Sequence, residues 1–120
     1  MTAANDIAFA RTMLKEALLL QSAGNLAAAE PRYRMVIEQG YRVAEVRPIL
    51  AGILGQRGAD DEALVLWGQV LTNEPDNAVA HHEQGLIHAR NGRFAAAIAA
   101  LEACCALTPE DAVAANNLAV

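Results

Sequence analysis

The chain repeats its own pattern every 34 residues, and this period limits the folds open to it more than any other feature. Glycines recur in step at Gly24, Gly58 and Gly92. Other residues in step are three alanines, three bulky side chains and two prolines: Ala29, Ala63 and Ala97; Tyr33, Trp67 and Leu101; Pro75 and Pro109. A fixed period of this length is typical of arrays of helical hairpins. Such arrays expose a long surface, so the period predicts binding rather than chemistry.

Each period is expected to contain two helices joined by a short turn, because apolar residues recur at helical spacing and glycine follows the first helix. Asn77 is expected to cap one helix, and Asp60 or Asp61 another. Pro31 and Pro48 are expected in first turns, where a missing N–H is harmless. The predicted helices span residues 6–23, 44–56, 78–90 and 94–107, in a single array over 1–120 with repeats at 6–41, 44–75 and 78–109.

Residues 111–120 begin a fourth unit and then stop in mid-helix. Since a solenoid needs a polar outer cap, this end is expected to be a cut inside a longer array. A short natural capping helix is the alternative interpretation. If Val113, Leu118 and Val120 lack a covering helix, the chain is expected to self-associate through this end.

Composition and charge argue against nucleic acid and membrane partners. Aromatic residues make up 4% of the chain, too few for a platform that stacks bases. Residues 1–60 hold seven basic and six acidic residues, a balance of +1, whereas residues 61–120 hold two and eight, a balance of −6. The first half is too weakly basic to follow a phosphate backbone, and the second half would repel nucleic acid and anionic lipid.

The cysteines and the first residues point to the cytoplasm. Cys104 and Cys105 are adjacent, so on a helix they point in different directions and cannot form a disulfide with each other. The absence of a disulfide framework fits a reducing compartment. Residues 1–10 have no basic segment followed by an apolar run, and no stretch reaches the roughly 18 apolar residues of a membrane span.

The sequence gives little support for a catalytic or metal-binding site. The segment from His82 to Leu86 begins like a zincin motif, but Leu86 stands where the second histidine must be. His81 and His88 share a face but lie about 10 Å apart along a helix axis. Cys104 and Cys105 lie on an apolar helix without a nearby base. We therefore predict no enzyme activity, no metal and no cofactor.

The repeated pattern resembles the tetratricopeptide repeat. The resemblance covers three units of 34 residues and departs from the family only where aromatic residues are expected in the first helix. The positions that carry it are the small residues Ala17, Ala51, Gly85, Ala29, Ala63 and Ala97, the large residues Tyr33, Trp67 and Leu101, and the closing prolines Pro75 and Pro109. The resemblance implies an all-α fold, a right-handed superhelical solenoid of antiparallel helix pairs.

In this family the concave wall is built from the first helix of each repeat. By resemblance, the expected peptide-binding groove consists of Arg11, Leu14, Leu18, Gln21, Glu45, Pro48, Gly52, Gly55, Gln56, Val79, His82, Leu86, Ala89 and Arg90. Exposed apolar side chains there would mark an interaction site, the glycines would leave room for a ligand, and the two arginines would bind a carboxylate or backbone carbonyls. The two-carboxylate clamp that some members use for acidic chaperone tails is absent, since Leu14 and Leu18 stand at its Lys and Asn positions.

The sequence thus predicts a non-catalytic, cytoplasmic module that binds a peptide or helical segment of a partner protein in its groove. A second hypothesis is the N-terminal recruitment region of a larger enzyme of the sulfotransferase, methyltransferase or glycosyltransferase type. A third is a small chaperone for secreted proteins.

Overall fold

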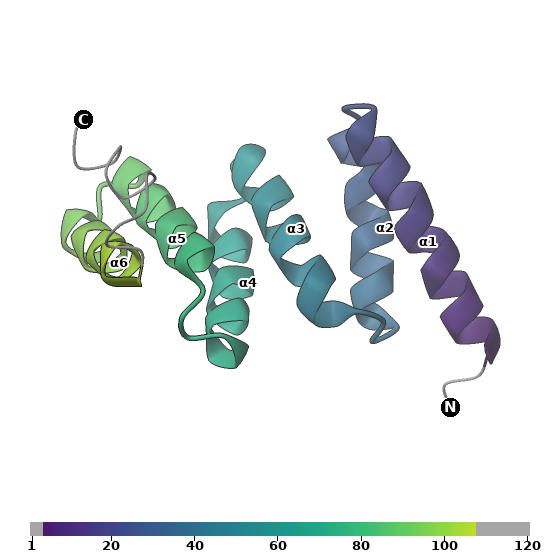
Figure 1. Ribbon diagram of the computed structural model, residues 1–120. Coiled ribbons are helices and arrows are strands. Elements are labelled where there is room, and N and C mark those ends of the chain that lie inside the picture. Colours follow the sequence, from purple (N-terminus) through teal and green to yellow (C-terminus); the bar gives the residue numbers. More distant parts are fainter. Residues whose placement is uncertain (1–3, 108–120) are drawn as a thin grey trace.

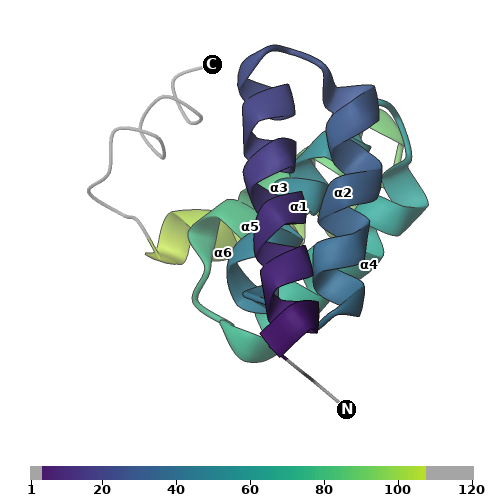
Figure 2. The same ribbon diagram turned by 90° about the vertical axis from the view of Figure 1, so that its right-hand side faces the viewer.

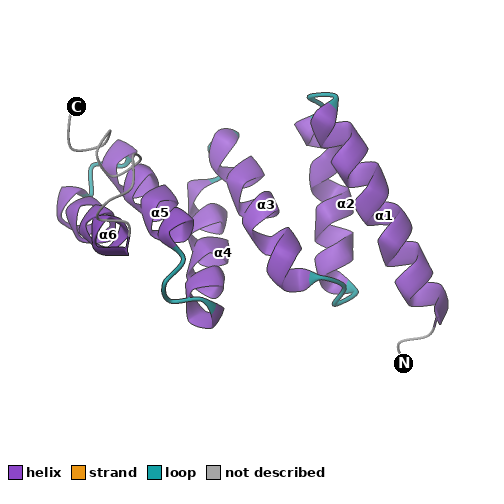
Figure 3. Ribbon diagram, viewed as in Figure 1, coloured by secondary structure: helices purple, strands orange, loops and turns teal. Residues whose placement is uncertain are grey.

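Local sequence signals set the helix boundaries of this chain. The computed structural model describes residues 4–107, and within them six helices and no strands are found (Figure 3). The helices are α1 (Ala4–Ser22), α2 (Leu26–Glu38), α3 (Val43–Gln56), α4 (Asp60–Asn73), α5 (Ala78–Arg90) and α6 (Phe94–Leu107). The predicted helices are confirmed to within two residues at their ends. The expected fourth unit over 111–120 lies outside the described residues.

Caps and glycines explain most of these boundaries. The side chain of Asn77 accepts a hydrogen bond from the Ala80 N–H at 2.9 Å, as predicted for the start of α5. Gly24, Gly58 and Gly92 follow the first helix of each pair with φ of 83°, 83° and 77°. This left-handed conformation costs glycine little, because glycine has no Cβ. Each hairpin therefore turns at the same place in the period.

Two expectations about helix starts are wrong. Pro31 and Pro48 are each the sixth residue of their helix, beyond the first turn. Neither aspartate caps α4, because the N-cap residue is Ala59 and it makes no side-chain cap bond. Asp60 instead accepts hydrogen bonds from Arg90 and Asn91 of the next hairpin. Asp60 is the first residue of α4 and not its N-cap, so its carboxylate is available to the guanidinium and amide groups of the next hairpin.

The helices form a row of antiparallel pairs that extends 49 Å along its longest axis (Figure 1). Helix α1 packs on α2, α3 on α4, and α5 on α6, while α2 contacts α3 and α4 contacts α5. Helices α3 and α5 also touch. Figure 2 views the row from the α1–α2 end, with the later pairs behind the first. The prediction of an all-α solenoid of helix pairs is confirmed.

Small residues bring the two helices of each pair close together. Ala17 and Ala29 are fully buried between α1 and α2, as are Ala51 and Ala63 between α3 and α4. In the third pair the approach is tighter, since a Cβ built on Gly85 would lie 2.8 Å from Cγ of Leu101. Contacts this short are not tolerated without movement, so an alanine at this position would require the Leu101 side chain to shift.

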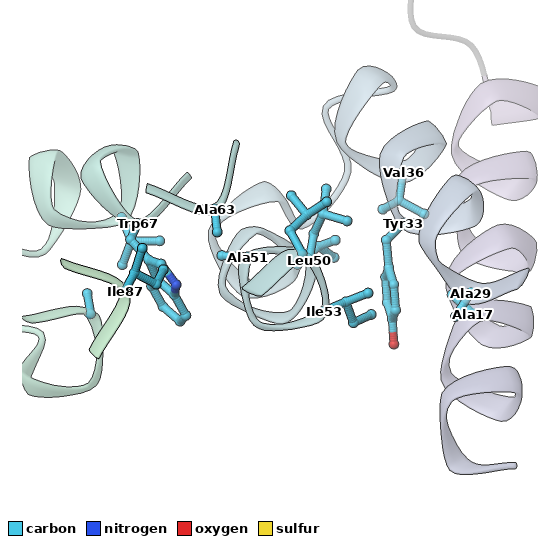
Figure 4. Close-up of a cluster of buried hydrophobic side chains, with 14 residues drawn as sticks. Ala17, Ala29, Tyr33, Val36, Leu50, Ala51, Ile53, Ala63, Trp67 and Ile87 are labelled. Carbon is cyan, nitrogen blue, oxygen red and sulfur yellow. The ribbon is translucent and has the colours of Figure 1, made fainter. Parts of the chain in front are cut away.

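Bulky residues on the second helix of each pair fill the space toward the next pair. In Figure 4 the ring of Tyr33 extends from α2 toward Ile53 of α3, and the ring of Trp67 extends from α4 toward Ile87 of α5. Tyr33 is fully buried and Trp67 is 3% exposed, whereas Leu101 at the same position of the third pair is half-buried. The core therefore runs as a strip between the pairs, as in other solenoids.

Candidate functional site

Two adjoining hollows lie along the face formed by the first helix of each pair. The α3–α5 hollow, about 340 Å³, is lined by Gly52, Gly55, Gln56, Trp67, Val79, Glu83 and Arg90. The α1–α3 hollow, about 470 Å³, is lined by Gln21, Gly24, Leu26, Pro48, Ile49, Gly52, Ile53 and Gln56. Gly52 and Gln56 belong to both, so the two hollows meet on α3. Volumes of this size lie in the range of small ligand sites.

The two glycines of α3 are not demanded by packing. A Cβ at Gly52 would meet no atom within 4 Å, and one at Gly55 would meet only Nη2 of Arg90 at 3.8 Å. Each glycine inside a helix costs up to about 1 kcal/mol relative to alanine. What these residues provide is room, which at Gly55 belongs to the α3–α5 hollow and at Gly52 to both hollows.

Arg90 is engaged within the protein rather than held ready for a ligand. Its Nε lies 3.2 Å from Oδ2 of Asp60, and its Nη2 lies 3.1 Å from the carbonyl oxygen of Gly55. Asn91 donates to the same Asp60 Oδ2 at 2.7 Å. The end of α5 is thereby tied to the start of α4 and the end of α3, and the carboxylate-binding role expected for Arg90 is already taken by Asp60.

The corresponding junction of the first two pairs has a different chemistry. Gln56 and Leu26 stand 34 residues before Arg90 and Asp60, and both line the α1–α3 hollow. An amide and an apolar side chain there replace the ion pair. The two hollows therefore occupy equivalent places in the repeat but present different side chains.

The Asp60 cluster should make part of the stability depend on pH. Arg90, with help from Asn91, lowers the pKa of Asp60 from 3.8 to about 2. A carboxylate with a lowered folded pKa contributes its stability above its unfolded pKa and loses it as the pH falls toward the folded value. We expect the urea midpoint of the wild type to fall between about pH 4 and pH 2, and Asp60→Asn to show a smaller fall.

Asp61→Asn is the matched control for this measurement, because Asp61 is the next residue of α4 and is exposed. It should retain the pH dependence of the wild type. Equal slopes for the wild type and Asp60→Asn over this range would contradict the assignment.

All the residues expected in the groove are at least partly exposed. Six of them line the hollows: Gln21, Pro48, Gly52, Gly55, Gln56 and Val79, with the paired Arg90 as a seventh. Among those that line neither hollow, Leu18 and Leu86 are 44% and 43% exposed, whereas Leu14 is partly buried against the core. His82 and Ala89 are half-buried.

Two other expected groove residues contact neighbours in the turn between α2 and α3. Arg11 is the largest influence that lowers the pKa of Tyr41, through a side-chain hydrogen bond. Glu45 pairs with Arg42 at 3.4 Å. These two residues lie away from both hollows.

The hollows also contain residues that the sequence reasoning did not assign to them. Trp67 belongs to α4 and was expected only in the core, yet it lines the α3–α5 hollow together with Glu83. Its position in the period identified it as a bulky interior residue, and no sequence signal distinguishes an interior ring from one that reaches a cavity wall.

The opposite side of the array carries an ion-pair cluster. Glu30 of α2 accepts from Arg57 Nε at 2.7 Å and from Arg34 Nη2 at 2.9 Å, and Arg34 Nη1 also bonds Glu62 at 2.7 Å. Arg57, more than Arg34, lowers the pKa of Glu30. The cluster joins the first two pairs and borders an apolar hollow of about 280 Å³ beside Val65.

In the described part of the chain, two histidines make hydrogen bonds to nearby residues, and the two cysteines are at least half-buried. His81 Nε2 lies 3.0 Å from the Pro75 carbonyl oxygen, and His88 Nδ1 accepts from Arg93 Nε at 3.0 Å. Cys104 is buried and Cys105 half-buried. Over residues 4–107 no three His, Cys, Asp or Glu side chains are grouped closely enough to hold a metal ion. Nor does any helix in this range combine the length and apolar character needed to cross a bilayer.

Comparison with known proteins places this geometry in a family. Two profiles described as tetratricopeptide repeat match residues 14–78 and 78–111. The crystal structure of YrrB, "a TPR protein with an unusual peptide-binding site", is similar with a TM-score of 0.82 and 20% identity, over 92% of this chain and 57% of YrrB. The crystal structure of MamA is similar with a TM-score of 0.75 and 20% identity, over 83% of this chain and 58% of MamA.

The chain therefore spans just over half the length of these two proteins. At 20% identity the likeness concerns the fold alone. No curated protein matches the chain.

Proposed function

Because the chain belongs to the tetratricopeptide repeat family of protein-interaction modules, we propose that it binds a peptide segment of a partner protein on the face formed by α1, α3 and α5. The observation that carries this proposal is the pair of adjoining hollows that meet at Gly52 and Gln56. Together they lie on both sides of α3 and have lining residues from all three helix pairs, which suits a ligand longer than a single side chain.

Apolar side chains on the same helices supply the binding energy in this proposal. Leu18 of α1 and Leu86 of α5 are each more than two-fifths exposed, and Val79 of α5 is 62% exposed. A soluble protein gains nothing from apolar area left in water, and grouped exposed apolar residues mark interaction sites. Burying such area yields about 25 cal/mol per Å².

The charges of this face indicate a ligand that is not strongly acidic. Arg90 is already paired with Asp60, and Arg11 is near enough to the Tyr41 hydroxyl to lower its pKa. Leu14 and Leu18 stand where a carboxylate clamp would need polar side chains. We therefore infer that the ligand is a partly apolar and nearly neutral segment.

The proposal is tested with peptides selected from a random library of 12-residue sequences displayed on phage, with the whole chain as bait. The triple variant Leu14→Glu/Leu18→Glu/Leu86→Glu is expected to bind the selected peptides at least about tenfold more weakly, since each glutamate removes apolar contact area and resists desolvation. Fluorescence anisotropy of labelled peptides measures the Kd.

The matched control is Leu19→Glu/Val65→Glu/Phe94→Glu, which changes three side chains that are 71%, 60% and 66% exposed and lie outside the set of residues expected in the groove. This variant should retain wild-type affinity, and circular dichroism should show both variants folded. Equal weakening by the two triple variants, or by neither, would refute binding on the proposed face.

We further infer a non-catalytic role in the cytoplasm, without nucleic acid or membrane ligands. The adjacent cysteines, the low aromatic content and the net charge of −5 support this inference. Self-association through Val113, Leu118 and Val120 concerns residues outside the described part of the chain, and light scattering over a concentration series tests it.

A further inference from the structure

The indole N–H of Trp67 is a buried hydrogen-bond donor without an acceptor. Its Nε1 is shielded from solvent and has no partner, and the residue as a whole is 3% exposed. Buried polar groups in folded proteins are nearly always hydrogen-bonded, because a donor that loses water without gaining an acceptor is unfavourable. A donor left in this state calls for a functional explanation.

The donor lies beside the α3–α5 hollow. Trp67 belongs to α4 and forms part of the lining of this hollow. Gly52 and Gly55 of α3 also line the hollow, and neither has a side chain. In Figure 4 the indole nitrogen lies on the ring edge turned toward α3. An acceptor that enters the hollow between α3 and α5 therefore approaches the ring, and it reaches Nε1, which is shielded in the free protein, when the indole turns toward the hollow.

The charges around the hollow favour a ligand whose hydrogen-bond acceptor is uncharged. Of its seven lining residues, Glu83 is anionic and Arg90 is the one arginine or lysine, and Asp60 already pairs with Arg90. A ligand carboxylate would meet Glu83 and Asp60 without an uncommitted cation among the lining residues. An amide carbonyl carries no such penalty and is a full-strength acceptor.

The glycines of α3 favour a peptide ligand with an extended backbone. With no side chain at Gly52 and no atom within 4 Å of a Cβ built there, a ligand main chain can come close to α3, while beside Gly55 it would meet the Arg90 guanidinium. In a helical ligand the carbonyl oxygens already accept hydrogen bonds within the helix, whereas an extended segment keeps its carbonyls available. The combination of an orphan donor and an open glycine surface suits a single extended strand.

We propose that the α3–α5 hollow binds an extended peptide whose backbone carbonyl oxygen accepts a hydrogen bond from Trp67 Nε1–H while the peptide passes over Gly52 and Gly55. This inference rests on the proposed function and adds the conformation of the ligand and the group that recognises it. It assigns a ligand contact to a residue of the second helix of its pair.

Trp67 is the only tryptophan in the chain, so its indole N–H gives one signal in an ¹H–¹⁵N spectrum. The probe is the highest-affinity peptide from the 12-residue library. On addition of this peptide the indole proton should move downfield as the hydrogen bond forms, and nuclear Overhauser effects should show an extended peptide. An unchanged indole signal on a saturated complex, or a helical peptide, would overturn the inference.

Replacement of Trp67 by 3-benzothienylalanine keeps the shape of the ring and exchanges the N–H for sulfur. It should leave thermal unfolding close to that of the wild type and weaken peptide binding about tenfold. Undiminished affinity would overturn the hydrogen bond.

A pair of glycine variants tests the passage over α3. Gly52 and Gly68 are both helix-interior glycines at which a Cβ would meet no atom within 4 Å, but only Gly52 lines the hollows. Gly52→Ala and Gly68→Ala should raise the melting temperature similarly, and only Gly52→Ala should weaken binding, by roughly threefold or more. Equal affinities would overturn the close approach to Gly52.

These outcomes also separate this inference from the proposed function. If no peptide is selected, or if the groove triple variant binds as tightly as the wild type, the proposed function fails. If binding depends on the groove leucines but is indifferent to the Trp67 and Gly52 replacements, only the further inference fails.

Discussion

Trp67→Ala is expected to lower the free energy of unfolding by about 3–5 kcal/mol. The side chain is 3% exposed and lies between the second and third helix pairs, where it joins the core residues Ile87 and Ala63. Its removal loses the stabilisation gained by burying the largest side chain of the protein, and it leaves a cavity beside the α3–α5 hollow. Urea denaturation followed by circular dichroism at 222 nm measures the loss.

Val65→Ala is the control, since Val65 lies on the same helix and is 60% exposed. It should change stability by less than about 0.5 kcal/mol. A Trp67→Ala midpoint equal to that of the wild type would show that Trp67 does not support the junction between the pairs.

Tyr33→Ala is expected to cost about as much, roughly 3–5 kcal/mol, because Tyr33 occupies the same place in the first pair and is fully buried. Its ring fills the space toward Ile53, and its hydroxyl donates a hydrogen bond to Oε1 of Gln21. Tyr33→Phe retains the ring and should cost only about 0.5–1.5 kcal/mol. The same urea experiment separates the packing contribution from the hydrogen bond.

Leu101 completes this comparison across the period. It stands at the equivalent position of the third pair but is half-buried, so Leu101→Ala should cost less than either aromatic truncation. Equal losses for Tyr33→Ala and Leu101→Ala would mean that burial at this position does not govern its contribution.

Most of the fold could be predicted from the sequence because its signals are local and periodic. Glycine after the first helix of each period, Asn77 at a helix start and the spaced alanines each act within a few residues of chain. The capping role expected for Asp60 was wrong, and a residue far away in the sequence binds its side chain. Aspartate is a favourable capping residue, but Ala59 occupies the N-cap of α4, and Arg90, thirty residues later, binds the Asp60 carboxylate.

The candidate site could be predicted only in part for the same reason. The resemblance to tetratricopeptide repeats put Gly52 and Gln56 in the expected groove, and both residues line the two hollows. Whether Arg90 is available to a ligand depends on which acidic group the neighbouring pair brings to it. Sequence spacing carries no information about that distance.

The sequence by itself determined the period, the helix pairs and the small residues that let the pairs close, since these follow from backbone preference and side-chain size. The tertiary structure alone decided that Arg90 is neutralised, that Leu101 packs directly over Gly85, and that the N–H of Trp67 is left without an acceptor next to a hollow. Each of these depends on how closely two helices approach. That approach results from the packing of many side chains at once, and no single segment of the chain specifies it.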